Sequence, residues 1–224
     1  MKKFIKYTIL AILILTLFIV GFIIFEGYSI YKDAIQKVSI QDKVASIQED
    51  TNYLTYEEIP KDFRNAIIAI EDHRFKTHNG IDLIGTARAI VINLSELSLS
   101  QGGSTITQQL ARNMYFTQEA KFTRKIAELF VAFDLEKNYS KNDILTFYIN
   151  TIYFGDGYYG LKEASLGYFN KEPSDLTLDE MTLLAGIPNA PSVYALTNNP
   201  DLAKQRQKQV ISAMVEYGYL EEEI

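Results

Sequence analysis

The residues best suited to chemistry in this sequence fall into three segments between positions 71 and 128. In the central segment, Gly102–Leu110, two glycines precede Ser, Thr and Gln side chains that can hydrogen-bond. Glycine lets the backbone approach a bulky ligand, and Ser or Thr can cap a helix whose free N–H groups bind an anion. An acidic and basic segment, Glu71–Asp82, precedes it, and Arg124, Lys125 and Glu128 follow. An acid, a polar glycine loop, a basic pair and a second acid together indicate sugar–phosphate chemistry.

Helices are predicted to position these groups. Apolar residues at Phe63, Ala66, Ile67 and Ile70 have the i, i+3, i+4, i+7 spacing of one helical face, and that helix ends at Glu71. Further helices are predicted over residues 83–94, 105–113, 122–137, 161–169, 177–186 and 203–217. The 122–137 helix is amphipathic, with a core stripe expected at Ile126, Leu129, Phe130, Phe133 and Leu135.

The sequence also marks the N-termini of two helices and one loop. Ser140-x-x-Asp143 and Thr177-x-x-Glu180 have the form of capping boxes. Residues 153–160 hold three glycines and three tyrosines and are expected to form a loop. Because strand signals are sparse, the sequence predicts a mainly α fold.

The composition excludes several classes of protein. The chain has 224 residues, no Cys, two His and a formal net charge of −6. The absence of Cys excludes disulfides and thiolate catalysis, and the negative charge argues against a nucleic-acid partner. Without its N-terminal segment, the chain has the length of one ordinary domain.

The N-terminal segment has the properties of a membrane anchor. Lys2, Lys3 and Lys6 precede the run Tyr7–Phe25, which is 19 residues long and uncharged. At 1.5 Å per residue this run is long enough to cross a hydrocarbon core of about 30 Å. The preceding lysines place the N-terminus in the cytoplasm and the rest of the chain outside the cell membrane. A cleaved signal peptide is the alternative, but no small-x-small cleavage site follows.

Taken in order, these segments resemble the five motifs of the peptidoglycan glycosyltransferases. The first two are Glu71-Asp72-His73-Arg74-Phe75-x-x-His78-x-Gly80 and Gly103-Ser104-Thr105-Ile106-Thr107-Gln108-Gln109. The third extends from Arg124 to Asn150, the fourth from Tyr153 to Lys171, and the fifth from Glu180 to Tyr194. The resemblance covers roughly residues 50 to 217, with departures at Asn170 and Leu196, where the family often has Gly and Pro.

The resemblance implies a lysozyme-like catalytic domain that polymerises lipid II into linear glycan strands. It is closest to the monofunctional members, which have one membrane anchor and one catalytic domain. The implied organisation is a cytoplasmic tip and anchor over residues 1–27, a juxtamembrane stalk over 28–50, and the catalytic domain over 51–224. The implied partners are lipid II, the growing lipid-linked glycan, the membrane and other cell-wall synthesis proteins.

The resemblance also implies roles for individual residues. Glu71 is the expected catalytic base, ionised at neutral pH if its pKa is the ordinary value near 4.3. Glu128 is the second catalytic carboxylate, which could orient the basic groups, bind a divalent metal at the pyrophosphate or support the donor sugar. Substrate binding is implied for Asp72, Phe75, His78, Gly103, Ser104, Thr107, Gln108, Gln109, Arg112, Asn113, Arg124 and Lys125. Simpler interpretations stay open: Phe75 as core packing, His78 as a structural hydrogen-bonding residue, and Glu128 as a helix ion pair with Arg124 and Lys125.

Several questions stay open in the sequence. Carboxylates beside a diphosphate suit Mg²⁺ or Mn²⁺, although no feature demands a metal. A mobile segment is expected over residues 87–101, because a sugar polymer has to slide past it. The alternative functions are a lysozyme-like glycan hydrolase and a non-catalytic cell-wall scaffold. The basic residues argue against the hydrolase, and the retained pair Glu71 and Glu128 argues against the scaffold.

Overall fold

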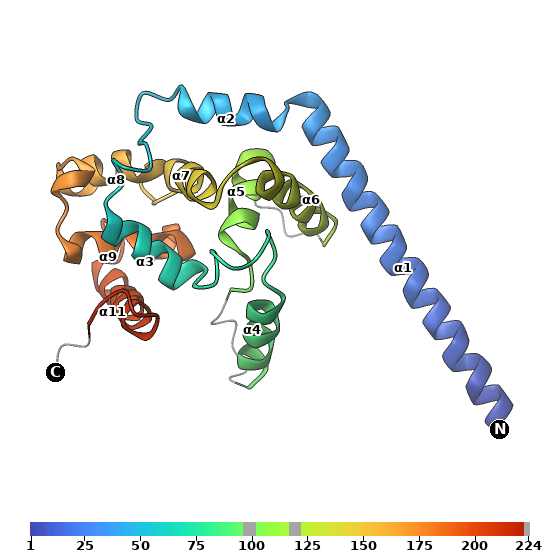
Figure 1. Ribbon diagram of the computed structural model, residues 1–224. Coiled ribbons are helices and arrows are strands. Elements are labelled where there is room, and N and C mark those ends of the chain that lie inside the picture. The colour runs from blue at the N-terminus through green and yellow to red at the C-terminus, as the bar shows by residue number, and fades with distance from the viewer. Residues whose placement is uncertain (96–101, 117–121, 222–224) are drawn as a thin grey trace.

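The fold is built from helices. The computed structural model describes residues 1–95, 102–116 and 122–221 (Figure 1). Within these ranges, extended backbone pairs only at one isolated antiparallel bridge between Tyr153 and Tyr159, inside the expected loop. The prediction of a mainly α fold is therefore confirmed. Of the segment expected to be mobile, residues 87–95 belong to a helix, and residues 96–101 lie outside the described part of the chain.

Every predicted helix is present, whereas the helices Ile40–Gln48 and Pro191–Tyr194 were not predicted. In chain order they are α1 (Lys2–Lys37), α2 (Ile40–Gln48), α3 (Lys61–Glu71), α4 (Leu83–Ser95), α5 (Ile106–Tyr115), α6 (Phe122–Asn138), α7 (Lys141–Thr151), α8 (Gly160–Phe169), α9 (Leu178–Gly186), α10 (Pro191–Tyr194) and α11 (Pro200–Glu216), with the 3₁₀ turns η1 (Pro173–Asp175) and η2 (Ile187–Asn189). Complete capping boxes begin α5, α7 and α9, at Thr105, Ser140 and Thr177. The last two confirm the sequence signals.

The core is built from buried side chains of most of the helices, among them α3, α5, α6 and α7. Phe63, Ala66 and Ile67 of α3 are buried, as their spacing predicted, and Tyr148 of α7 is the largest fully buried side chain. Helix α3 packs against α9 and α11, while α5 packs against α6 and α7. Hydrogen bonds from α5 to Glu71 and Asp72 join the end of α3 to the second of these groups.

The predicted core stripe of α6 needs one correction. Phe133 was expected in the core but is 46% exposed. The buried face of α6 instead passes through Ala127, Glu128, Val131, Ala132 and Leu135. Phe133 points away from that face, and a carboxylate, Glu128, lies on it.

Helix α1 extends well beyond the globular part of the chain (Figure 1). It is long and apolar enough to cross a membrane, and none of the side chains in its apolar window is buried. The helix continues without a break to Lys37, so residues 28–37 of the expected stalk form one rod with the apolar segment.

The end of α1 is packed closely against α6. A Cβ atom on Gly27 would lie 2.5 Å from Cβ of Ile126, so only glycine permits this approach. One turn further, the Tyr31 hydroxyl donates a hydrogen bond to Asp134, and the Tyr31 and Phe130 rings lie 5.5 Å apart. The anchor helix is thus joined to the helix that carries Arg124, Lys125 and Glu128.

This contact predicts a specific effect of Gly27→Leu. The larger side chain cannot fit against Ile126, and overpacking of this kind costs about 1–3 kcal/mol. Because each kcal/mol shifts Tm by about 2–4 °C in a domain of this size, thermal unfolding in detergent micelles should occur several degrees lower. Gly21→Leu is the matched control, because nothing lies within 4 Å of a Cβ at Gly21. Equal Tm values for the two variants would contradict the close packing.

Candidate active site

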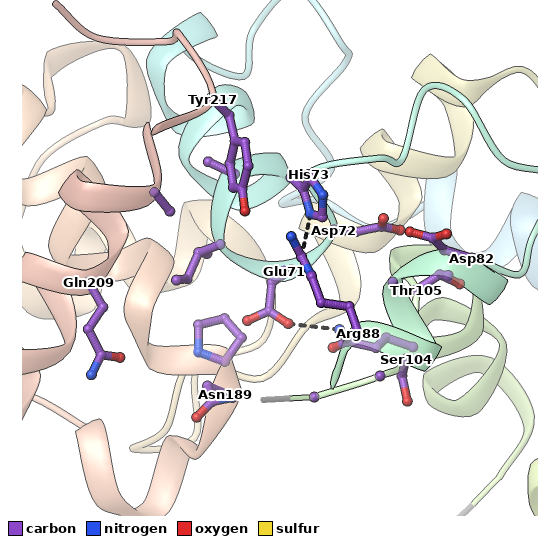
Figure 2. A pocket seen from close by; sticks show the side chains of 18 of the residues that line it. Glu71, Asp72, His73, Asp82, Arg88, Ser104, Thr105, Asn189, Gln209 and Tyr217 are labelled. Atoms are coloured by element: carbon purple, nitrogen blue, oxygen red, sulfur yellow. Dashed lines mark hydrogen bonds between the residues drawn. The ribbon is translucent and has the colours of Figure 1, made fainter. Parts of the chain in front are cut away.

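Glu71 lies at the end of α3 in an open pocket with a volume of about 630 Å³. One wall is formed by α4 and the start of α5, including Arg88, Ser104 and Thr105. The opposite wall is formed by η2 and α11, including Asn189 and Gln209. In Figure 2 the Glu71 side chain lies between these two walls.

The two oxygens of the Glu71 carboxylate have different surroundings. Oε2 accepts a hydrogen bond of 2.8 Å from Nε2 of Gln109. Oε1 is buried and has no hydrogen-bond partner among the described residues. A buried oxygen without a donor is a strong acceptor for an incoming hydroxyl, because nothing else satisfies it.

Burial also changes the basicity of Glu71. Desolvation raises the pKa of this carboxyl above its usual 4.5, and the hydrogen bond from Gln109, followed by the charges of Arg206 and Arg112, opposes the rise. The pKa of Glu71 is therefore higher than the ordinary value expected from the sequence. A raised pKa makes the ionised carboxylate a better base, which suits proton abstraction near neutral pH.

Asp72 fixes the turn that follows Glu71. Its carboxylate is buried and accepts hydrogen bonds from Nε2 of His78, at 2.9 and 3.1 Å, and from the backbone N–H of Ile106, at 3.0 Å. Close by, the Thr105 hydroxyl donates a 2.7 Å hydrogen bond to the carbonyl of Gly80. These contacts join the first two sequence motifs, so the end of α3 is held against the start of α5.

Glu128 forms a second charged group beside the pocket. Its side chain is 1% exposed and pairs through Oε1 with Arg124 and through Oε2, at 3.2 Å, with Lys125. Nζ of Lys125 also donates a 2.6 Å hydrogen bond to the hydroxyl of Ser104, which lines the pocket. The buried carboxylate therefore holds two cations beside the glycine loop.

The structure brings about half of the predicted site residues to the pocket. Glu71, Asp72, Gly103, Ser104, Gln109 and Arg112 line it, while Arg124, Lys125 and Glu128 are linked to it through Ser104. Asn113 is exposed and outside the lining, so its role in binding stays a prediction.

Four predicted binding residues are buried and make structural contacts, so their role in binding stays a prediction. Phe75 is 1% exposed and lies under Nζ of Lys141, and His78 is bonded to Asp72. The Thr107 hydroxyl donates to Glu136 at 2.6 Å. Oε1 of Gln108 accepts the backbone N–H of Thr105 in the capping box. None of these four side chains lines the pocket.

Other pocket residues were missed by the sequence interpretation. The His73 ring stacks on Tyr217 with 4.3 Å between ring centroids, and His73 Nδ1 accepts a 3.3 Å hydrogen bond from Arg88 (Figure 2). Burial, followed by the charge of Arg88, lowers the pKa of His73, which favours the neutral ring. Arg206 reaches the pocket from α11. No local sequence signal marks Arg88 or Arg206, because only tertiary packing brings their helices to Glu71.

The residues around Glu128 are a poor fit for a resident Mg²⁺ or Mn²⁺ ion. Both oxygens of this carboxylate already face cations, whereas these metals need free oxygen ligands. Within residues 1–95, 102–116 and 122–221, no group of three or more His, Asp or Glu side chains could hold a metal. We therefore derive no step of the chemistry through a bound metal.

The raised pKa of Glu71 predicts that Glu71→Gln stabilises the fold at neutral pH. A carboxyl whose pKa is higher in the folded state opposes folding once it is ionised. The neutral amide avoids this cost, so Tm of Glu71→Gln at pH 7 should exceed that of the wild-type protein. The difference should shrink as the pH falls through the raised pKa toward 4.5 and below. Thermal unfolding across this range measures it, and a lower Tm at pH 7 would contradict the prediction.

Comparison with known proteins places this site in a family. Residues 39–215 match the family described as Transglycosylase. The chain is 42% identical over 222 residues to penicillin-binding protein 1F of Bacillus subtilis, covering 93% of this chain and 31% of that protein. It is 44% identical over 177 residues to the "Putative transglycosylase" of Cupriavidus necator, covering 79% and 76% of the two chains.

A third relative, penicillin-binding protein 1A of Neisseria gonorrhoeae, is 48% identical over 159 residues, which cover 71% of this chain and 20% of that protein. The chain thus spans about a third or less of the two penicillin-binding proteins and three quarters of the Cupriavidus protein. The matched range includes Glu71, the glycine loop and the Glu128 group, and it shows that the chain belongs to the transglycosylase family.

Proposed function

We propose that this protein polymerises lipid II into linear peptidoglycan strands, with Glu71 as the catalytic base. The observation that carries the proposal is the unpartnered Oε1 of Glu71 in a pocket lined by cations. Membership of the transglycosylase family supports glycosyl transfer as the reaction. The apolar helix α1 supports a substrate that carries a lipid.

The proposed reaction proceeds in one displacement. Oε1 of Glu71 takes the proton of the acceptor sugar hydroxyl, and the resulting oxygen forms a bond with the anomeric carbon of the donor. The bond between that carbon and the lipid pyrophosphate breaks, and the electron pair leaves with the pyrophosphate. Attack opposite the leaving group inverts α to β through a transition state with oxocarbenium character. No covalent sugar–enzyme intermediate is required.

The leaving pyrophosphate needs positive charge arranged in advance. Lys125 is suited to this task because Glu128 and Ser104 fix its ammonium group beside the glycine loop. Arg112 supplies a second cation in the same pocket as Glu71. Glu128 therefore acts through the two cations that it orients and has no direct role in proton transfer.

The proposal includes an orientation of the protein in the membrane. Lysines at positions 2, 3 and 6 precede the apolar part of α1, so the N-terminus is cytoplasmic and the catalytic domain is extracytoplasmic. The domain then lies on the side of the membrane where glycan strands are assembled. Other cell-wall synthesis proteins are its natural partners there.

Polymerisation of labelled lipid II in detergent tests the proposal. The wild-type protein should form polymer, and Glu71→Gln should lose at least about 100-fold in rate, since a positioned base contributes about 10²–10⁴-fold. Gel separation of the labelled products measures both. Glu172→Gln is the matched control, because Glu172 is exposed and outside the pocket.

Three outcomes would contradict the proposal. Equal polymer from wild type and Glu71→Gln would remove Glu71 from the base role. Release of reducing sugar from finished peptidoglycan, without polymerisation, would favour a hydrolase. Absence of any turnover by a correctly folded wild-type protein would favour a scaffold.

A further inference from the structure

A buried tyrosine lies behind the contact between Gln109 and Glu71. The Tyr148 side chain is fully buried on α7, and its hydroxyl donates a 3.1 Å hydrogen bond to Oε1 of Gln109. Nε2 of the same amide donates a 2.8 Å hydrogen bond to Oε2 of Glu71. Gln109 lines the pocket and Tyr148 does not. The three side chains come from α7, α5 and α3, so the chain of hydrogen bonds crosses the core.

The direction of these hydrogen bonds is fixed by the chemistry of the groups. An ionised carboxylate can only accept hydrogen bonds, so the Gln109 NH₂ group has to face Glu71. The amide oxygen then faces Tyr148, whose hydroxyl has to donate. Burial raises the pKa of Tyr148 far above its usual range, so this hydroxyl keeps its proton at any working pH. The Glu71 carboxylate and the Tyr148 hydroxyl therefore hold the two ends of the amide together, and the hydroxyl adds to the preference for this orientation.

We propose that Tyr148 is a positioning residue for the catalytic base and that Oε1 of Glu71 is the atom that takes the proton. Through Gln109, Tyr148 keeps a donor on Oε2, which leaves Oε1 as the Glu71 oxygen without a hydrogen-bond partner among the described residues. The side chain is thereby held with its buried, donor-free oxygen as the one available to the acceptor hydroxyl. This inference rests on the proposed function and adds to it the residue that orients the catalytic carboxylate.

The remaining charged groups around Glu71 do not substitute for this contact. Arg112, on α5, and Arg206, on α11, act on Glu71 through their charges, and Asp72 is its neighbour in the chain. Among the described contacts, neither arginine donates a hydrogen bond to Glu71. Oε2 accepts one from Gln109, and Oε1 has no partner. Their charges favour the ionised carboxylate, while the Tyr148–Gln109 pair sets its orientation.

Tyr148→Phe removes only the hydroxyl and keeps the ring that fills the core. The Gln109 amide can then rotate, so the donor on Glu71 is lost for part of the time. With lipid II as the substrate, kcat should fall about tenfold, the rate change that corresponds to one lost hydrogen bond. KM should stay within about twofold, because Tyr148 does not line the pocket. The acid limb of the kcat–pH profile should shift to higher pH, since a weaker donor favours the protonated carboxyl.

Two further variants make the test specific. Tyr115→Phe is the matched control, since it loses a 3.0 Å hydrogen bond from a tyrosine hydroxyl to the Val38 carbonyl, outside the pocket. It should keep the wild-type kcat and pH profile. In a Gln109→Leu background the amide is absent, so Tyr148 has no route to Glu71. Adding Tyr148→Phe to that background should then change kcat by less than about twofold. Effects of this kind are non-additive because one residue acts through the other. Thermal unfolding of every variant confirms folding.

The outcomes separate this inference from the proposed function. Wild-type activity combined with an unchanged kcat and pH profile in Tyr148→Phe would overturn the positioning role alone. A tenfold loss that persists in the Gln109→Leu background would also overturn it, because Tyr148 would then act by another route. Absence of polymer from the wild-type protein would overturn the proposed function and this inference with it.

Discussion

The buried carboxylate of Asp72 is the contact on which the geometry of the site depends. It accepts hydrogen bonds from the side chain of His78 and from the backbone of Ile106, so the turn after α3 is tied to the first residue of α5. Glu71 precedes this carboxylate in the chain, and Gln109 follows Ile106 within one helical turn. A buried carboxylate that loses its partners costs about 3–5 kcal/mol. The contacts of Asp72 therefore fix the distance between Glu71 and Gln109.

The charges of the two functional carboxylates are compensated to different extents. Glu128 has a cation on each oxygen, so its charge is compensated and it serves to hold Arg124 and Lys125 in place. Glu71 has one amide donor and one unpartnered oxygen, so part of its desolvation is left uncompensated. That imbalance gives Glu71 a raised pKa and an oxygen free to accept a proton. Stability is lost at the position where reactivity is needed, a common compromise in active sites.

The sequence predicted the helices well because their signals are local. Apolar spacing located α3 and its end at Glu71, and the capping boxes at Ser140 and Thr177 began α7 and α9 as expected. Motif membership was a weaker guide to which side chains line the pocket. His78 and Thr107 belong to the recognised motifs, yet both side chains make buried hydrogen bonds that hold the motifs together. Tyr148 belongs to the third motif and is buried as core packing, but only tertiary packing brings its hydroxyl to Gln109 and Arg206 to the pocket.

Titration of the Glu71 carboxyl group in the intact protein tests the central claim most directly. Carbon-13 NMR of glutamate-labelled protein in detergent micelles would follow the side-chain carboxyl signals with pH, and the signal missing from Glu71→Gln would identify residue 71. A carboxylate that is desolvated and held by a single donor should titrate with a midpoint above 4.5, the usual value for this side chain. A midpoint at or below 4.5 would show a solvated or fully paired carboxylate, and would contradict the account of Glu71 as a base activated by burial.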